Sequence, residues 1–199
     1  MFHKKTGSVS LFSNFFRYRG LQMGLGIWVD ADMLLLKPLE DLGDVICGWQ
    51  DKSRINGAVL HLPRDHPFLN EYLELMDSSI AVPPTWTTLK KARQNLRGWV
   101  GLQRKVEEMR WGTFGPLAIT YGAKKYGFVA LDPAVFYPLP PESAEQVFNP
   151  HYDVHKHIEK ETRALHLWNE RIKIKKIHPP APGSFMNWAQ QRYLSASAN

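Results

Sequence analysis

The sequence predicts an α/β fold, and two observations carry that prediction. Short apolar runs of the length of buried strands occur between longer segments whose apolar residues recur every three or four positions, as on one face of an amphipathic helix. The composition, with 44% hydrophobic, 12% aromatic and 22% charged residues, is that of ordinary globular proteins. A chain of 199 residues has room for one well-packed domain, which we expect over residues 1–178, followed by a tail with a short helix over residues 179–199.

The cysteine content, the apolar runs and the net charge narrow the class of protein. The single cysteine, Cys47, excludes an internal disulfide framework and a cysteine-based zinc site, and its apolar neighbours indicate a small buried side chain. No run approaches the roughly 18 to 20 apolar residues that span a bilayer, and the first residues lack a signal-peptide core, so we expect a soluble chain. The formal net charge of +6 favours a polyanionic partner, such as nucleic acid, an anionic membrane surface or a phosphorylated substrate.

The first expected elements are a helix over residues 8–22 and a strand over residues 26–29. Apolar residues with mostly three- and four-residue spacing predict the helix, with Ser8 or Ser10 as N-cap and Gly24 as its stop. Its Arg17 and Arg19 either reach a phosphate near the strand end or lie solvated on the polar face, and the solvated position is the more common one. The strand is predicted by a four-residue apolar run that is too short for a helix.

Two aspartates follow this strand in the segment Asp30-Ala31-Asp32. In an extended chain both carboxylates project to one side, and the small Ala31 turns into the packing. The pair lies between two apolar runs, where a merely solvated pair would be poorly placed. Asp-Xaa-Asp after an apolar strand suits a divalent cation with oxygen ligands, Mn²⁺ or Mg²⁺ rather than zinc.

Further strands are expected over residues 45–49 and 58–62, separated by a polar turn at residues 51–54. Within this region Asn56-Gly57 has two interpretations with about equal weight, a turn or an amide that binds a sugar hydroxyl. Pro67 then begins a helix whose apolar spacing predicts the buried residues Phe68, Leu69, Tyr72, Leu73 and Met76.

The middle of the chain contains two expected helices. Residues 87–109 form a basic helical stretch interrupted by glycines, which either faces acidic lipid or nucleic acid or is simply solvated. A glycine-rich segment then leads into a helix that begins at Pro116 and ends at Gly127. Its N-terminus is a weak indication of anion binding.

The last third of the sequence predicts strands over residues 128–131, 135–137 and 163–168, and an edge strand over the alternating residues 170–177. A short helix with Phe185, Trp188 and Tyr193 follows. Three histidines occur in residues 151–157, but no cysteine or further acidic partner completes a ligand set, so we do not assign a metal site there.

Four segments together resemble one family of enzymes. LFSNFFRYRGLQMGLGIWVDADMLLLKPL, NGAVLHLPRDHPFL, WGTFGPLAITYGAKKYG and ALHLWN occur in the order found in glycosyltransferases with an Asp-Xaa-Asp sugar-binding region. That family includes alpha-1,4-galactosyltransferases and yeast initiating mannosyltransferases. The four segments run from Leu11 to Asn169, and their joint agreement is far more specific than any one motif.

The resemblance implies an A-type, Rossmann-like glycosyltransferase fold, a nucleotide-sugar donor such as a UDP-sugar, and a retaining transfer. By position, Asp30 would contact the ribose and sugar of the donor, and Asp32 would ligate the metal, with His166 as a further metal or diphosphate contact. Asn56 and Gly57 would lie against the donor sugar.

The acceptor side would be lined by Trp111, Gly115 and Pro116. No residue is identified as a catalytic nucleophile, but Gln50 and Asp51 end a strand near the expected site and are candidates for stabilising a sugar cation. A bound Mn²⁺ or Mg²⁺ would stabilise the negative charge on the departing diphosphate.

One departure from the family pattern concerns the first half of the fold. Family members have an additional strand, helix and strand before the region that begins here at Leu11, and this half holds the nucleotide base. We therefore expect an N-terminally truncated chain that lacks part of the nucleotide-binding half.

The predicted function is a metal-dependent hexosyltransferase that moves a sugar, with galactose as the first choice, to a polysaccharide, lipopolysaccharide or other glycolipid. The expected setting is bacterial and cytoplasmic, with peripheral contact at the inner face of the plasma membrane. The main alternative is a catalytically silent module that binds a glycan or a partner. A haloacid-dehalogenase-type phosphatase is a remote alternative, since Met33 stands where that motif has Thr or Val. A nucleic-acid-binding protein is not expected, because the basic residues are dispersed.

Overall fold

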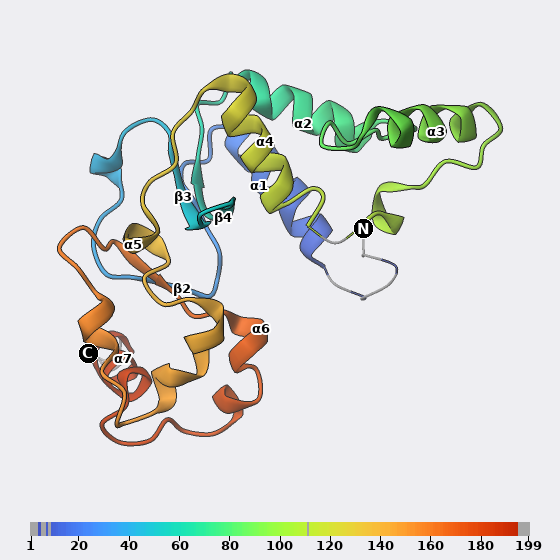
Figure 1. Cartoon of the computed structure of the whole chain (residues 1–199). Helices are drawn as coiled ribbons and strands as arrows, with labels where there is room; N and C mark the ends of the chain where they lie inside the picture. The colour runs from blue at the N-terminus through green and yellow to red at the C-terminus, as the bar shows by residue number, and fades with distance from the viewer. Residues whose placement is uncertain (1–3, 5–6, 8, 111, 195–199) are drawn as a thin grey trace. The chain divides into compact units, whose positions relative to one another are not determined.

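The chain forms two compact units in the computed structural model, which describes all residues except 1–3, 5–6, 8, 111 and 195–199 (Figure 1). The first unit combines Met1–Val29 with Leu42–Leu131, and the second combines Asp30–Asp41 with Asp132–Asn199. Each unit mixes helices with a small sheet, which confirms the α/β class at this coarse level.

A three-stranded antiparallel sheet with the order β1-β4-β3 forms the centre of the first unit. β1 (Trp28–Val29) and β3 (Ile46–Asp51) flank β4 (Arg54–His61), and most residues of β4 are buried because it is the central strand. The β3–β4 hairpin closes at Lys52 and Ser53, which confirms the predicted polar turn.

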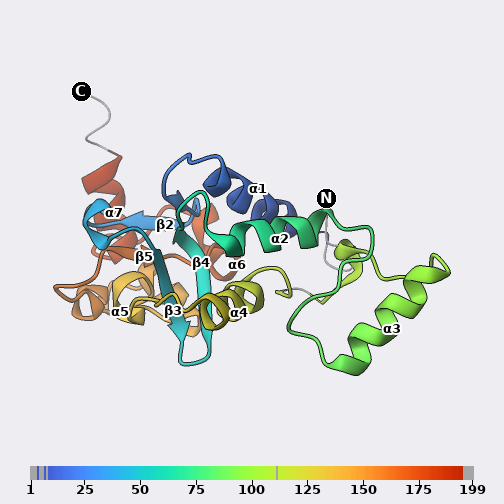
Figure 2. The same ribbon diagram turned by 90° about the horizontal axis from the view of Figure 1, so that it is seen from above.

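Three helices pack together in this unit. α1 (Ser10–Gln22) packs against α2 (Pro67–Asp77), and α4 (Pro116–Tyr126) packs against both α2 and β4 (Figure 2). The predicted apolar face of α2 is confirmed, since Phe68, Leu69, Tyr72, Leu73 and Met76 are all buried. The predicted ends of α4 are confirmed as well: Pro116 begins the helix, and Gly127 ends it in the left-handed conformation with φ 74°.

The basic stretch is shorter than predicted. α3 (Thr88–Trp99) is followed by a turn in which Gly101 adopts φ 71°, a left-handed conformation that interrupts the helix. A single 3₁₀ turn, η2 (Val106–Glu108), follows. Gln94 is the one buried residue of α3, so this helix contributes little to the core.

The second unit is built on the antiparallel pair β2 (Met33–Leu35) and β5 (Ala164–His166). Its remaining elements are short, and its core contains Leu139, Val147, Val154, Leu165, Phe185 and Ala189. The helices are α5 (Pro133–Phe136), α6 (Asn169–Ile172) and α7 (Phe185–Tyr193), and the 3₁₀ turns are η3 (Pro141–Phe148), η4 (Val154–His157) and η5 (Lys175–Ile177). A further turn, η1 (Glu40–Leu42), lies where the chain leaves this unit. The predicted tail helix is confirmed as α7.

Several local predictions are wrong. Of the two interpretations of Asn56-Gly57, the turn is wrong: these residues lie inside β4, because the hairpin already closes earlier in the chain. Residues 135–137 lie in and just after α5 instead of forming a strand: Pro133 fixes the first helical residue, and the Asp132 carboxylate accepts the Ala134 N–H at 2.9 Å. Residues 128–131 pair with β3 only through Leu131.

Two further corrections concern chain segments near the ends. Residues 170–177 form α6 and η5 and not an edge strand, so their alternation of charge and apolar side chains does not reflect a sheet. α1 is preceded by Val9 with no side-chain cap, so Ser10 is its first residue and not its N-cap. Ser8 lies outside the described residues.

Candidate functional site

The two aspartates of the Asp-Xaa-Asp segment lie in a turn between β1 and β2. The carbonyl oxygen of Asp30 accepts the N–H of Met33 at 3.0 Å, which closes a four-residue turn. Ala31 is exposed, so the expectation of an extended segment with a packed Ala31 is wrong. The turn places both aspartates at the start of β2, within the second unit.

Asp32 and His166 come together because β2 pairs with β5. Met33 lies opposite His166 in the sheet register, and the N–H of Leu167 donates to the carbonyl oxygen of Asp32 at 2.9 Å. Nε2 of His166 then lies 3.3 Å from Oδ2 of Asp32. The pairing thus brings together the Asp-Xaa-Asp segment and the segment ALHLWN, the first and the last of the four segments that carry the family resemblance.

Trp168 completes the surroundings of this pair. Its φ of 53° makes it the one non-glycine residue with positive φ in the described part of the chain, a conformation that costs about 1–3 kcal/mol. The turn directs the next N–H, that of Asn169, to Oδ2 of Asp32 at 2.9 Å. The Trp168 indole N–H donates to the Leu139 carbonyl at 2.8 Å. The centroids of the Trp168 and His166 rings lie 3.9 Å apart. The strained backbone of Trp168 therefore holds a hydrogen-bond donor, the Asn169 N–H, against the Asp32 carboxylate.

These contacts hold Asp32 in its ionised form. Burial acts to raise the pKa of Asp32, but the hydrogen bond and charge of His166 and the N–H of Asn169 outweigh burial and lower it. The Asp32 side chain keeps 26% of its exposed area, whereas that of His166 keeps 8%. Asp32 is thus an accessible carboxylate supported by a buried imidazole.

A divalent cation fits this arrangement through Asp32. Mn²⁺ and Mg²⁺ are commonly held by one or two carboxylates plus substrate phosphates, so a complete protein ligand set is not required. No group of three or more His, Cys, Asp or Glu residues that could hold a metal occurs among the described residues. Nδ1 of His166 is buried and has no hydrogen-bond partner among the described residues, and Nε2 faces Asp32, so direct ligation by His166 would require Nε2 to leave the carboxylate.

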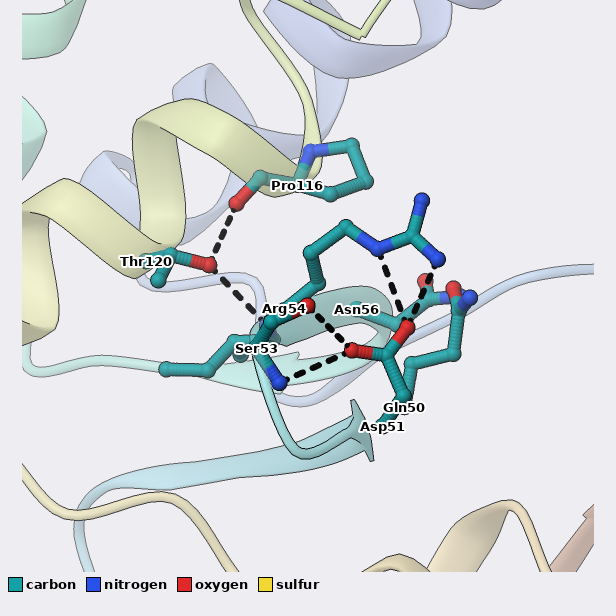
Figure 3. A network of polar contacts seen from close by, with 8 residues as sticks. Gln50, Asp51, Ser53, Arg54, Asn56, Pro116 and Thr120 are labelled. Atoms are coloured by element: carbon teal, nitrogen blue, oxygen red, sulfur yellow. Dashed lines mark hydrogen bonds and ion pairs between the residues drawn. The ribbon is translucent and has the colours of Figure 1, made fainter. Parts of the chain in front are cut away.

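Gln50, Asp51 and Asn56 lie together on the β3–β4 hairpin of the first unit (Figure 3). The side-chain amide of Asn56 donates to Oε1 of Gln50 at 2.9 Å. The carboxylate of Asp51 accepts from Ser53 and, at 2.7 and 2.9 Å, from the guanidinium of Arg54. Burial acts to raise the pKa of Asp51, but these hydrogen bonds lower it to about 2. Asp51 therefore stabilises the hairpin turn.

Gly57 lies against Arg17. A Cβ atom on Gly57 would lie 2.5 Å from Nη1 of Arg17, so a side chain at this position would have to displace the guanidinium. Arg17 is only 7% exposed, and its guanidinium lies 5.3 Å from the ring centre of Trp28. The expectation of a solvated side chain is thus wrong for Arg17 but correct for Arg19, which bonds Asp77 and Gln22 at the surface.

The segment predicted for the acceptor side is anchored to the sheet. Thr120 Oγ1 donates to the Pro116 carbonyl at 2.6 Å and accepts the N–H of Ile55 at 2.9 Å, which ties the first turn of α4 to β4 (Figure 3). Gly115 precedes the helix, and a Cβ there would lie 3.3 Å from the Asn14 amide. Trp111 lies outside the described residues.

The predicted site residues thus fall into two groups. Asp30, Asp32 and His166 belong to the second unit, and the remaining described ones, Gln50, Asp51, Asn56, Gly57, Gly115 and Pro116, belong to the first. Sequence reasoning missed Asn169 and the buried position of Arg17. The position of Arg17 four residues before the apolar Leu21 was a signal for burial, whereas nothing local marks the N–H of Asn169.

Comparison with known proteins finds related transferases. Lactosylceramide 4-alpha-galactosyltransferase from Mus musculus is 27% identical over 171 residues, covering 73% of this chain and 37% of that protein. The enzyme of the same name from Homo sapiens is 26% identical over 162 residues, covering 73% and 38%. The chain therefore spans well under half the length of these relatives. No protein-family model and no solved structure matches the chain.

The proteins to which the chain is similar are thus alpha-galactosyltransferases, which agrees with the coarser part of the resemblance predicted from the sequence. The described helices include none that is both long and apolar enough to cross a membrane.

Proposed function

We propose that this chain is the sugar-binding and catalytic part of a metal-dependent, retaining galactosyltransferase with an A-type fold. The donor is a nucleotide sugar, with UDP-galactose as the first choice, and the acceptor is a glycan or glycolipid. The similarity to named galactosyltransferases supports the reaction class. The observation that carries the site is the accessible Asp32 carboxylate, fixed by His166 and by the Asn169 N–H.

Asp32 is the proposed metal ligand, and His166 positions it. Because Nε2 of His166 faces a carboxylate oxygen, the imidazole donates its proton there and keeps the carboxylate in one orientation. Asn169 holds the same oxygen from the backbone. Asp30, two residues earlier, is the proposed contact to the ribose and sugar of the donor. When bound, Mn²⁺ or Mg²⁺ would neutralise the charge that develops on the departing diphosphate.

On the first unit, Gln50 is a better candidate than Asp51 for contact with the sugar. Asp51 is occupied by Ser53 and Arg54 at the hairpin turn. Gln50 accepts from Asn56, while its own amide nitrogen has no hydrogen-bond partner in the part of the chain that the structure describes. We propose that Gln50 and Asn56 act as a linked amide pair beside Gly57, and that Gly115 and Pro116 lie on the acceptor side.

Calorimetric titration of UDP-galactose, with and without Mn²⁺, tests the proposal on the wild-type chain, on Asp32→Ala and on His166→Ala. We expect Mn²⁺-dependent binding that Asp32→Ala abolishes. His166→Ala should weaken Mn²⁺-dependent binding by about 10- to 100-fold, the usual effect of losing a group that orients a metal ligand.

The matched control is Asp44→Ala, which removes an exposed carboxylate outside the site and should bind as the wild type does. Equal Mn²⁺-dependent binding by wild type and Asp32→Ala would contradict the role of Asp32. If well-folded wild type binds no nucleotide sugar at all, the silent-module alternative replaces the proposed function.

A further inference from the structure

A cavity of about 540 Å³ in the first unit is lined by cationic side chains. Lys90, Arg93 and Arg97 come from α3, and Arg104 and Arg110 come from the segment after it. No aspartate or glutamate occurs among the described residues that line the cavity. Its volume lies in the range of about 300–1,000 Å³ that is usual for small-molecule sites.

The five cations have no counter-ion in the part of the chain that the structure describes. The side chains of these five residues make no ion pair or hydrogen bond with any residue that the structure describes, whereas Lys125 of the same unit, for example, is paired with Glu71 at 2.7 Å. The nearby Glu108 is engaged by Lys4 at 2.5 Å. Five like charges around one cavity repel one another, so a bound anion would relieve this repulsion.

The cavity wall is held in place by Gln94. This residue is 3% exposed, and its amide nitrogen donates to the carbonyls of Arg104 at 2.8 Å and Ala81 at 3.2 Å. Its Oε1 accepts the Arg104 N–H at 3.1 Å. Because a buried glutamine fixes the loop backbone to α3, the arginines are presented from two connected segments and not from one solvated helix face.

We propose that this cavity binds a phosphate-bearing group. The planar guanidinium groups offer paired N–H donors that match phosphate oxygens, and four of the five cations are arginines. The bearer of the phosphate is either a soluble molecule or the headgroup of an anionic lipid. Two apolar side chains of α3 are largely exposed, Leu89 with 80% and Trp99 with 84% of its area accessible to solvent. Apolar side chains of this kind insert into a lipid surface when a basic helix binds to it, so substitution of one of them tests the lipid source. The proposal does not depend on the galactosyltransferase function.

Titration with inorganic pyrophosphate in metal-free buffer tests the site. We expect Arg93→Gln/Arg97→Gln to weaken binding by about 10-fold or more, because two charge-assisted donors are lost. Arg110→Gln, in a different segment, should also weaken it. The control Lys52→Gln/Arg64→Gln removes two exposed cations of the same unit away from the cavity and should leave binding unchanged. Asp32→Ala should bind normally, which separates this site from the proposed donor site.

Sedimentation with phosphatidylcholine vesicles, with and without phosphatidylglycerol, identifies the source. A lipid headgroup predicts binding to the anionic vesicles that is lost in Arg93→Gln/Arg97→Gln and reduced in Trp99→Gln, with pyrophosphate binding by Trp99→Gln unchanged. A soluble ligand predicts pyrophosphate binding without vesicle binding. The proposal is overturned if wild type binds neither probe, or if the cavity variants bind as the control does.

Discussion

At the scale of single residues, the ionisation of Asp32 gives a pH-dependent stability. Its pKa is lowered in the folded chain, against about 3.9 in an unfolded one, so the folded state favours the carboxylate. This contribution is fully present above pH about 4 and is lost as the pH falls through the lower, folded pKa. We expect Asp32→Asn to be less stable than wild type by about 1 kcal/mol at pH 6, with the difference vanishing in acid.

Urea unfolding of both proteins between pH 6 and pH 2.5 measures this difference. Asp44→Asn serves as the reference, since its exposed carboxylate accepts no hydrogen bond from the described residues and should show no such trend. A difference between wild type and Asp32→Asn that stays constant down to the lowest pH would contradict the assigned hydrogen bonds.

A second residue-scale prediction concerns Gly57. A methyl group there would meet Nη1 of Arg17 at 2.5 Å, so Gly57→Ala must displace a guanidinium that is buried beside Trp28. We expect a loss of about 1–3 kcal/mol in the free energy of unfolding. In an Arg17→Ala background the same glycine substitution should cost much less, and a double-mutant cycle of thermal unfolding measures that coupling. Additive effects would mean that Arg17 is not the cause.

At the scale of elements, the sequence predicted those helices whose start, stop and apolar spacing agree. α2 and α4 have proline at the first position and, for α4, glycine past the end, so local signals fixed both. Prediction failed where a pattern was short. Residues 135–137 are apolar like a strand, but Asp132 and Pro133 begin a helix there. The Asp51 carboxylate stabilises the hairpin turn at an earlier position, so Asn56-Gly57 does not form a turn.

The candidate site shows the same division. Asp32 and His166 were both proposed from the sequence as metal contacts, yet their spacing could not be predicted, because it depends on pairing between β2 and β5. The backbone donor of Asn169 depends on the left-handed conformation of Trp168, for which tryptophan has no intrinsic preference. The sequence therefore named Asp32 and His166 as candidates, whereas the contact between them, which tertiary pairing makes, could not be predicted.

Alanine substitution of two helical glycines, Gly20 and Gly122, is expected to change the stability of the protein in opposite directions. Alanine is favoured over glycine inside a helix by about 1 kcal/mol, so space decides the outcome. A Cβ on Gly20 in α1 would have its nearest neighbour at 3.7 Å, and Gly20→Ala should stabilise the protein by about 0.5 kcal/mol. A Cβ on Gly122 in α4 would lie 2.5 Å from the buried ring of Phe68, and Gly122→Ala should destabilise it by about 1–2 kcal/mol.

Chemical denaturation of the two variants and of wild type measures both effects. Because the substitution is the same, helix propensity is matched and only the packing of α4 against α2 differs. Stabilisation by Gly122→Ala would show that α2 moves away from α4 at little cost, and would contradict the close packing described for these helices.

At the scale of the whole molecule, both units are discontinuous in sequence. The chain leaves the first unit after Val29, returns at Leu42 and leaves it again after Leu131. β2 lies within the short excursion and pairs with β5, far along the chain. Contacts of such long sequence separation form late and are invisible to local patterns, which is why the division into units could not be read from composition or periodicity.

The rate at which a thiol reagent labels the single cysteine measures how often the first unit opens. Cys47 lies in β3 with no exposed area, and burial raises the pKa of its thiol to about 12. Since only an exposed thiolate reacts, labelling by a thiol reagent at pH 8 requires opening of the sheet. We expect native labelling to be about a thousand-fold or more slower than labelling in urea, given the stability typical of small domains. Gly122→Ala should accelerate it in proportion to its loss of stability, and Gly20→Ala should slow it. Rapid labelling of the native chain, equal in both variants, would instead mean that β3 opens locally without unfolding the helices that cover it.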